Sequence, residues 1–243
     1  MIIDALVIAA HPDDAEIGAG GTLLRLASLG YTTGILDLTR GELSTRGTPA
    51  ERTEESLAAA RLLGLSHRST LDLGDGQLAD THQARSSLVA ALRRLRPKLV
   101  LTHYWEQPHP DHVAAARLVR AAVYLAGLTK WDALEGTERH RPGAVAHFGL
   151  PKGTTPSFIV DISAWAEQKM AAIRCHRSQF HDPHRQEPET IISSEGFLER
   201  LDALQRAAGA AIGTRHGEGF FIREALALDD PVQQLSRTMD ILF

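Results

Sequence analysis

Apolar segments of strand length alternate with helix-like segments along the first half of the chain. The sequence predicts strands at residues 2–9, 32–38, 69–73 and 98–103 and helices at residues 15–29, 48–64, 81–96 and 109–126. Nearly continuous apolar strands that alternate with helices are typical of a parallel sheet with both faces covered. We therefore expect an α/β fold of the Rossmann-like type, with a mostly parallel central sheet and helices on both faces.

The second half of the chain follows this alternation less regularly. We predict strands at residues 144–150, 158–161 and 219–228, a helix at residues 163–177 that Ser163 caps, and a helix at residues 196–211. Residues 127–143 have weak periodicity, and the polar segment 178–195 is expected to form a loop that covers a site. Because 243 residues suffice for one α/β domain with a full core, we expect residues 1–243 to form a single domain with C-terminal strands.

Charge and composition narrow the range of partners and compartments. A net charge of -4 without a basic stripe argues against a nucleic-acid partner. No apolar run reaches the length of a membrane span, so we expect no membrane contact. A lone cysteine, Cys175, rules out an intrachain disulfide framework and fits a reducing compartment. We therefore expect a cytoplasmic protein.

Two polar clusters each follow a predicted strand. Ala10-His11-Pro12-Asp13-Asp14-Ala15-Glu16 follows the first strand, and His109-Pro110-Asp111-His112 follows the fourth. In a parallel sheet both turns lie at the carboxyl edge, where α/β proteins bind ligands. Helix caps or ordinary turns would explain either cluster alone. Their joint occurrence after two apolar strands favours one shared site.

The residue types in the two clusters predict a catalytic metal centre. His11, Asp14 and His112 supply two imidazoles and one carboxylate, a common catalytic zinc set that leaves a position for water. Such a set also accepts Fe²⁺ or Co²⁺. Zinc lowers the pKa of a bound water to about 7. Asp13, next to the ligand Asp14, is then free to accept the proton of that water as a general base.

The remaining polar residues of the second cluster suit supporting roles. His109 stands three positions before His112 at a helix start, so both side chains share one face. We expect a protonated His109 to stabilise an oxyanion and to donate a proton to a leaving amine. Asp111, which lies between them, is expected to set the tautomer of an imidazole.

The two motifs at residues 10–16 and 109–112 resemble those of the PIG-L or LmbE-like zinc deacetylases, which remove acetyl groups from N-acetylglucosamine conjugates. This resemblance implies a Rossmann-like fold, zinc on the three residues named above, Asp13 as general base, and His109 as the charged partner of the tetrahedral intermediate. Each of these implications agrees with the fold and the residue roles predicted above from the sequence pattern. Family members of this kind often form hexamers, so the resemblance also suggests a homo-oligomer.

Further stretches resemble one branch of this family, the bacillithiol-biosynthesis enzymes that deacetylate N-acetylglucosaminyl malate. They lie at residues 37–42, 45–48, 51–52, 178–180 and 218–220. Malate adds two carboxylates to the sugar, and Arg46 and Arg52 are predicted at the sheet edge, where bidentate pairing would hold them. The alternative for either arginine is an ordinary solvated charge in a loop or helix.

One departure from the family pattern concerns the residue that polarises the substrate carbonyl. Related enzymes are expected to use a tyrosine from the C-terminal region, and here Phe197 stands at the position where we would look for it. No tyrosine follows Tyr124, so this role is vacant, filled by His109 and zinc, or taken by Tyr104 in the nearby loop.

Other functions stay open at this point. One alternative within the same enzyme class is deacetylation of another glycoconjugate, of the mycothiol or chitooligosaccharide type. Another alternative is a metal-binding protein without turnover. Gly18-Ala19-Gly20-Gly21 and Asp37 prompt a dinucleotide-binding oxidoreductase, but these glycines do not occupy the turn after the first strand. We expect them instead to let the first helix pack closely on the sheet. The spacing of His176, His181 and His184 fits no single helical face, so we do not predict a second metal site there.

Overall fold

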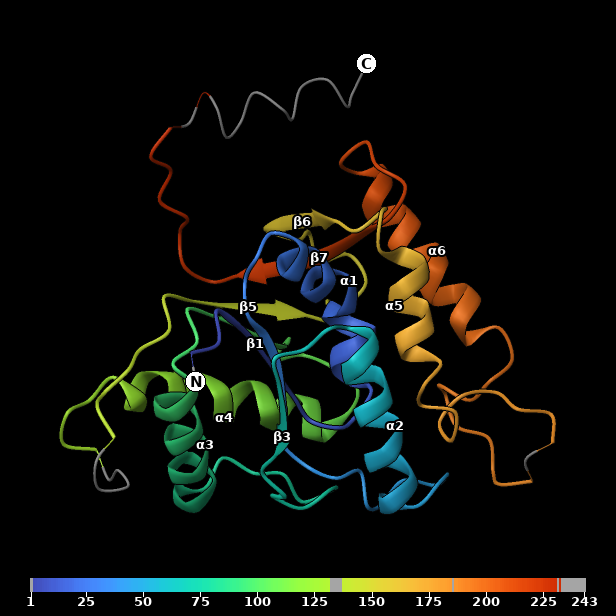
Figure 1. Cartoon of the computed structure of the whole chain (residues 1–243), viewed down its shortest axis with the longest axis horizontal. Coiled ribbons are helices and arrows are strands. Elements are labelled where there is room, and N and C mark those ends of the chain that lie inside the picture. The colour runs from blue at the N-terminus through green and yellow to red at the C-terminus, as the bar shows by residue number, and fades with distance from the viewer. Residues whose placement is uncertain (1, 132–136, 185, 231, 233–243) are drawn as a thin grey trace.

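The computed structural model describes residues 2–131, 137–184, 186–230 and 232. Its centre is a seven-stranded sheet with the strand order β3-β2-β1-β4-β5-β7-β6 (Figure 1). The strands are β1 (Ala5–Ala9), β2 (Thr33–Asp37), β3 (His67–Thr70), β4 (Leu99–His103), β5 (Ala144–Phe148), β6 (Phe158–Asp161) and β7 (Gly217–Ile222). The helices are α1 (Asp14–Ser28), α2 (Pro49–Leu62), α3 (His82–Leu95), α4 (Pro110–Ala126), α5 (Ala166–Ile173) and α6 (Phe197–Ala210).

The sheet is mostly parallel, as the alternation of strands and helices predicts. Strand β1 pairs in parallel with both β2 and β4, and the outer pairs β2–β3 and β4–β5 are also parallel. Strand β7 runs antiparallel to β5 and to β6, so only the C-terminal edge departs from the parallel order. The chain therefore leaves β1 in one direction along the sheet and returns to its other side at β4, which makes the β1–β4 boundary a topological switch point.

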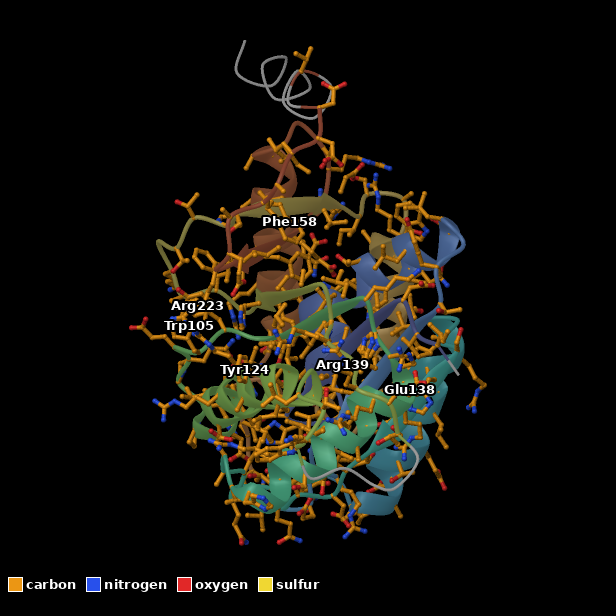
Figure 2. All side chains as sticks on the ribbon, turned by 90° about the vertical axis from the view of Figure 1, so that its left-hand side faces the viewer. Trp105, Tyr124, Glu138, Arg139, Phe158 and Arg223 are labelled. Atoms are coloured by element: carbon orange, nitrogen blue, oxygen red, sulfur yellow. The ribbon has the colours of Figure 1, made fainter. Side chains whose placement is uncertain are left out.

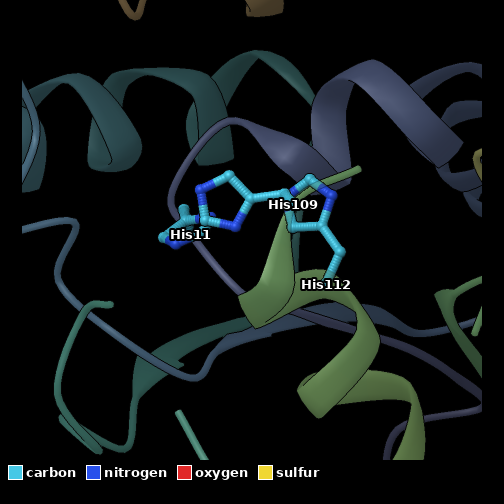
Figure 3. A group of neighbouring side chains, drawn as sticks. All are labelled: His11, His109 and His112. Atoms are coloured by element: carbon cyan, nitrogen blue, oxygen red, sulfur yellow. The ribbon is translucent and has the colours of Figure 1, made fainter. Parts of the chain in front are cut away.

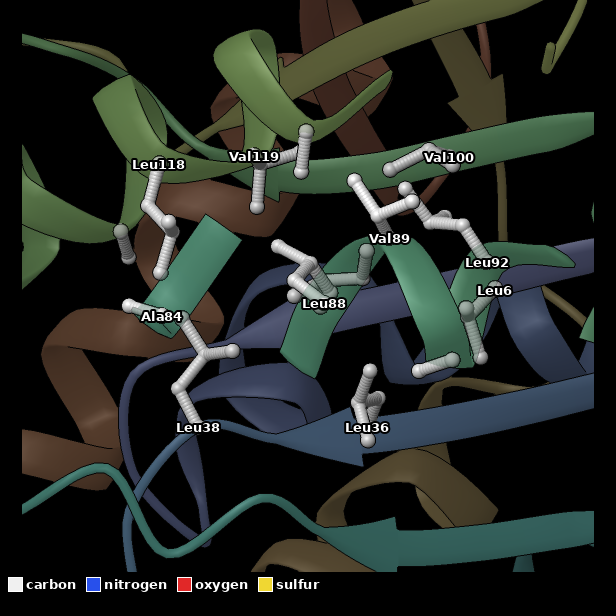
Figure 4. Packing of buried hydrophobic residues seen from close by; sticks show 14 of the residues in the cluster. Leu6, Leu36, Leu38, Ala84, Leu88, Val89, Leu92, Val100, Leu118 and Val119 are labelled. Atoms are coloured by element: carbon white, nitrogen blue, oxygen red, sulfur yellow. The ribbon is translucent and has the colours of Figure 1, made fainter. Parts of the chain in front are cut away.

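Two apolar cores cover the two faces of the sheet. On one face, Leu6 and Ile8 of β1 pack with residues of α3 and α4, including Leu88 and Val119 (Figure 4). On the other face, alternate β1 residues pack against α1 and α5. Since successive side chains of a strand point to opposite faces, a strand buried on both sides must be apolar throughout. This explains why every residue of β1 is buried.

Local sequence signals determine how the helices start and pack. The predicted capping box is present at α2, where Thr48 accepts a hydrogen bond from the Glu51 backbone and the Glu51 side chain accepts one from Thr48. The predicted close approach of α1 to its neighbours is also confirmed. A Cβ atom added at Gly18 would lie 2.3 Å from the Phe148 ring, and one added at Gly21 would lie 2.8 Å from three Ile162 atoms.

Several boundaries differ from the predicted ones. The third strand lies at His67–Thr70 rather than residues 69–73, because pairing with β2 ends at Asp37 and the chain then turns toward the site. The last strand ends at Ile222, where its pairing with β5 ends, and does not continue to residue 228. Ser163 does not cap a helix from residue 163: its hydroxyl donates to Asp161, and α5 begins later at Ala166. The weakly periodic segment lies partly outside the described residues.

Within the described ranges, no helix is long and apolar enough to cross a membrane. Cys175 is a free, half-buried thiol that packs beside the core on the α1 side.

Candidate metal and active site

The two predicted clusters meet at the carboxyl edge of the sheet, on either side of the β1–β4 boundary. His11, Asp13 and Asp14 lie directly after β1, and His109 and His112 lie at the start of α4, which follows β4. Because β1 and β4 are hydrogen-bonded neighbours, their two loops leave the sheet side by side. The switch point of the topology is therefore where the sequence clusters come together.

Asp14 lies within contact distance of both His11 and His112. The His11 Nδ1 atom is 3.1 Å from Asp14 Oδ2, and the His112 Nε2 atom is 3.3 Å from Asp14 Oδ1. The potential ligand atoms of His11, His109 and His112 all lie within 4.8 Å of one another, and Figure 3 shows these three rings facing a common space. The three residues predicted as metal ligands are thus brought together.

Hydrogen bonds on the far side of each ring set the atoms that face Asp14. His112 Nδ1 lies 2.7 Å from the Gln107 Oε1 acceptor, so it carries the proton and leaves the Nε2 lone pair toward Asp14. His11 Nε2 lies 3.0 Å from Asp75 and 3.3 Å from Asp111, so this atom is a donor, and Nδ1, which faces Asp14, offers a lone pair to a metal that displaces its proton. Metal-ligating histidines commonly donate their other N–H group to a carboxylate or carbonyl in this way. The donor set therefore fits a divalent metal held by His11 Nδ1, Asp14 and His112 Nε2.

The charges around His11 favour a cation at this position. Burial disfavours the charged ring, but hydrogen bonds to Asp14 and Asp75 outweigh burial and raise the pKa of His11 to about 11. Burial also opposes ionisation of Asp14, yet the histidines around it, His112 and His103, hold its pKa well below the usual range. These carboxylates stabilise a positive charge at His11, and a metal ion at Nδ1 would take the place of the proton there.

Asp13 is buried beside Arg52. The Arg52 Nη2 atom donates to Asp13 Oδ2 at 3.2 Å and also to the carbonyl of Pro12, while Nη1 donates to the carbonyl of Gly41. Burial raises the pKa of Asp13 to about 6, with Arg52 opposing the shift and the Asp14 carboxylate adding to it. Asp13 also has a φ of 114°, a backbone conformation that is strained for a residue other than glycine. The protein thus holds this carboxylate in place at a conformational cost of order 1–3 kcal/mol.

His109 caps the helix that carries His112. Its Nδ1 atom accepts a hydrogen bond from the Asp111 backbone N–H at 3.2 Å. Burial and the neighbouring His11 and His112 rings lower the pKa of His109. The ring is therefore neutral with its proton on Nε2, where we had expected an imidazolium, and Nε2–H is the donor that it offers to a bound molecule. The predicted role of His109 toward an oxyanion uses this N–H group.

Arg46 is buried under the segment that was predicted to cover a site. Its Nε donates to the Ser178 carbonyl at 3.2 Å and its Nη1 to the Glu187 carbonyl at 3.4 Å, while Gln179 donates to the Arg46 carbonyl. The Nη2 atom of Arg46 is buried without a hydrogen-bond partner among the described residues. Arg46 therefore ties the loop after β2 to the covering segment. Its binding to a substrate carboxylate, like that of Arg52, stays a prediction.

Two residues of the site were missed by the sequence analysis. Asp75 follows β3 in a Gly-Asp-Gly turn and reaches His11, 64 positions away in sequence. His103 ends β4, where its ring stacks on His112 at a centroid distance of 4.0 Å and its Nε2 accepts a hydrogen bond from the Ala10 N–H. For His103, the available signal was a polar residue at the carboxyl end of an apolar strand; for Asp75, it was a carboxylate in the loop that leaves the carboxyl end of β3.

The candidates for a carbonyl-polarising group occupy separate environments. Phe197 opens α6 and stacks on Phe180 in a small apolar cluster at a centroid distance of 6.0 Å. Tyr104 stacks on Trp105 and contacts the edge of His147, on the β5 side of the loop after β4. Of these candidates, His109 lies against the predicted ligands, with ring-centroid distances of 4.8 Å to His11 and 4.7 Å to His112.

Asp37, which suggested the dinucleotide alternative, already pairs with an arginine. Asp37 is buried, and both of its carboxylate oxygens accept hydrogen bonds from Arg68, which also pairs with Glu16. His176 lies against the same Glu16 at 3.1 Å rather than beside His181. Asp37 thus has no free oxygen for a ribose, and the turn after β1 holds a histidine and carboxylates where the dinucleotide motif needs glycine.

The strand order and the centre at the β1–β4 switch point define an α/β protein of the LmbE-like fold. A sequence profile described as "PIG-L: GlcNAc-PI de-N-acetylase" matches residues 6–123, which hold both motifs. The chain belongs to this PIG-L family, as its relatives also show.

Two solved structures share most of this fold. The conserved protein TT1542 of Thermus thermophilus is 41% identical with a TM-score of 0.84, covering 94% of this chain and 98% of its own. The N,N'-diacetylchitobiose deacetylase of Pyrococcus horikoshii is 31% identical with a TM-score of 0.80, covering 90% of this chain and 83% of its own.

Two curated relatives carry different activities in their names. The diacetylchitobiose deacetylase of Thermococcus kodakarensis is 37% identical over 88% of this chain and 80% of its own length. The 4-oxalmesaconate hydratase of Pseudomonas putida is 28% identical over 73% of this chain and 74% of its own. The family fold therefore serves more than one reaction, and the chemistry must be argued from the site.

Proposed function

We propose that this protein is a metal-dependent N-deacetylase that hydrolyses the acetamide of an N-acetylglucosamine conjugate. One observation carries the proposal: a buried carboxylate, Asp13, lies next to a His11, Asp14 and His112 set in which His11 Nδ1 and His112 Nε2 both face the Asp14 carboxylate. The similarity to deacetylases named for N-acetylglucosamine disaccharides supports the substrate class. We expect zinc in this set, although iron or cobalt in the divalent state suits the same ligands.

Each residue of the site has its own role in amide hydrolysis. A bound divalent cation supplies a lowered water pKa and a polarised carbonyl. Asp13 accepts a proton from the attacking water and, once protonated, is a proton source for the departing amine. His109 offers Nε2–H to the oxyanion of the tetrahedral intermediate, from a helix terminus that keeps the ring in place. Arg52 holds the Asp13 carboxylate in position through the Oδ2 contact.

The finer proposal is that the substrate is N-acetylglucosaminyl malate, of the bacillithiol type. It is motivated by Arg46, which lies on the loop after β2, and by Arg52, which lies at the start of α2 and contacts Asp13. The buried Nη2 of Arg46 and Nε of Arg52 are two guanidinium N–H groups without partners among the described residues, and each suits an added carboxylate. A chitooligosaccharide or a mycothiol-type conjugate is the alternative, and the names of the relatives favour these sugars.

The proposal is tested by measuring acetate release from purified protein whose metal content has been determined. We expect turnover with N-acetylglucosaminyl malate, loss of turnover after chelation, and its return with zinc. Asp13→Asn should lower kcat by about 100-fold or more, because the base is removed while the fold is kept. Asp72→Asn is the matched control, since Asp72 also has a positive φ but pairs with Arg40 at the surface.

Two outcomes would refute the assignment. Full turnover in metal-free protein contradicts metal dependence, and hydration of an unsaturated dicarboxylate without any acetate release places the chain with the hydratase relative. Equal kcat/KM for the malate conjugate and for diacetylchitobiose contradicts only the malate proposal.

We also propose, from the family resemblance, that the protein assembles as a homo-oligomer, with a hexamer as the expected form. Sedimentation velocity of the purified chain tests this, and a monomer at all concentrations contradicts it.

A further inference from the structure

A hollow of about 640 Å³ lies along the later turns of α4, on the α4 side of the sheet. Its wall is formed by the later turns of α4, one residue of α3, strand β5 with Arg141 just before it, and the two residues that follow β7. Along α4, Arg120 of this wall stands eight residues after His112, which corresponds to about 12 Å along a helix axis. The hollow is thus near the site but is built from different residues.

The wall of the hollow concentrates positive charge. Five arginines and one acid line it, namely Arg85, Arg117, Arg120, Arg141, Arg223 and Glu224. Arg85 is neutralised by Asp80, to which it makes two hydrogen bonds of 2.6 Å. Across residues 2–131, 137–184 and 186–230, the other four guanidinium groups have no carboxylate within salt-bridge distance. Four cations therefore face one carboxylate in a chain whose net charge is -4.

Aromatic rings hold two of these arginines in place. The Arg223 guanidinium lies 4.3 Å from the ring centre of Trp105, and that of Arg141 lies 4.9 Å from the ring centre of Tyr124. Figure 2 shows Arg223, Trp105 and Tyr124 on the same side of the molecule. A guanidinium that stacks on a ring keeps its N–H edge available and loses less freedom when it binds an oxyanion. The positive wall is thus partly preorganised.

His147 separates the hollow from the catalytic edge. It is 4% exposed, and its Nδ1 donates to the His103 carbonyl at 2.7 Å. His103 in turn stacks on His112. Burial lowers the pKa of His147, so this ring adds an uncharged polar group to the wall. No acid of the metal centre lines the hollow, so its arginines are not the counter-charges of that centre.

Clustered guanidinium groups repel one another, and an anion that enters between them relieves this repulsion. We propose that the hollow is an anion-binding site, separate from the metal centre, for a small molecule with two or more carboxylate or phosphate groups. Several arginines without carboxylate partners line the same hollow. They suit a ligand with several anionic groups better than a single oxyanion, because each carboxylate or phosphate can pair with the N–H donors of a different guanidinium.

Calorimetric titration of the full-length, metal-loaded protein tests the site at low ionic strength. The probes are propane-1,2,3-tricarboxylate, inorganic phosphate and, as a neutral counterpart, glycerol. We expect the tricarboxylate to bind at one site per chain and more tightly than phosphate, with an affinity that falls as salt is added, and glycerol not to bind. Arg117→Gln with Arg120→Gln should weaken tricarboxylate binding by about tenfold or more, since two charged hydrogen-bond donors are lost.

The matched control is Arg94→Gln with Arg174→Gln, which removes the same charge from exposed positions that do not line the hollow. It should bind the tricarboxylate as the unaltered protein does. The proposal is overturned if the unaltered protein does not bind the tricarboxylate below about 10 mM, if the Arg117/Arg120 variant binds it equally well, or if the control loses as much affinity.

Acetate release separates the two sources of such an anion. Neither Arg117 nor Arg120 belongs to the predicted catalytic residues, so kcat should be unchanged in their double variant. A KM rise for the malate conjugate alone would identify the anion as part of the substrate. Unchanged KM values, together with lost tricarboxylate binding, would identify a separate ligand. The calorimetric result stands even if the protein releases no acetate, so failure of the proposed activity and failure of the anion site are distinguishable.

Discussion

Replacing Lys169 by methionine should destabilise the protein strongly. Lys169 is 1% exposed, and its ammonium group lies 2.7 Å from Glu218 Oε1 and donates to the Ile17 carbonyl at 2.8 Å. Glu218 in turn accepts hydrogen bonds from the backbone N–H groups of Gly21 and Thr22 and from the Thr22 hydroxyl. The ion pair therefore links α5 and β7 to the middle of α1.

Breaking a buried pair leaves a charge without its partner, which costs about 3–5 kcal/mol. The three donors from α1 that still reach Glu218 reduce this penalty, so we expect Lys169→Met to lose about 3 kcal/mol of unfolding free energy. That is a large share of the roughly 5–15 kcal/mol of a typical domain. With a urea dependence of about 3 kcal/mol per molar, the unfolding midpoint should fall by about 1 M.

Equilibrium urea unfolding, followed by circular dichroism, measures this loss. Lys152→Met is the matched control, because Lys152 is exposed, and it should stay within about 0.5 kcal/mol of the unaltered protein. Lys169→Met with Glu218→Gln should be more stable than Lys169→Met alone, since it no longer buries an unpaired charge. A Lys169→Met loss below about 1 kcal/mol, or a double variant no more stable than the single one, refutes the reasoning.

Three further predictions concern the helix contact, an ion pair and the base. Gly21→Ala should lower the unfolding free energy by about 1–3 kcal/mol, because the added Cβ meets Ile162 at 2.8 Å; an unchanged or raised Tm contradicts this. The hydrogen bond from Lys98 lowers the pKa of Asp4 to about 2, below its ordinary value of 3.8. This contribution to stability is complete above pH 3.8 and is lost as the pH falls through 2, so Asp4→Asn should remove it from the acid-unfolding curve. Arg52→Gln removes a cation that opposes protonation of Asp13, so the acidic limb of the kcat/KM profile should move to higher pH, and an unmoved limb would show that the contact does not tune the base.

The fold and the proposed ligand set followed from patterns local to short segments. A strand buried on both faces is apolar along its whole length, so β1 and β4 were visible in the sequence, and the polar residues that follow them had to lie at one edge of a parallel sheet. The glycines of α1 likewise predicted close packing of this helix, because a helix that lies directly against a neighbour has no room for a side chain at these positions. The strand boundaries were less accurate, because hydrogen bonding to a neighbour, and not composition, ends a strand, as at Asp37 and Ile222.

The sequence by itself identified five side chains of the centre: His11, Asp14 and His112 as the proposed ligands, with Asp13 and His109 beside them. Only the tertiary structure decided which atom of each ring faces Asp14. That choice depends on Gln107 and on Asp75, which reach His112 and His11 from other loops. The pairing of Asp13 with Arg52, and the gathering of unpaired arginines on the far side of His147, likewise depend on segments that meet only in the folded chain. The protonation state of a side chain depends on the groups within a few ångströms of it. Sequence spacing does not show which residues from distant segments will lie that close.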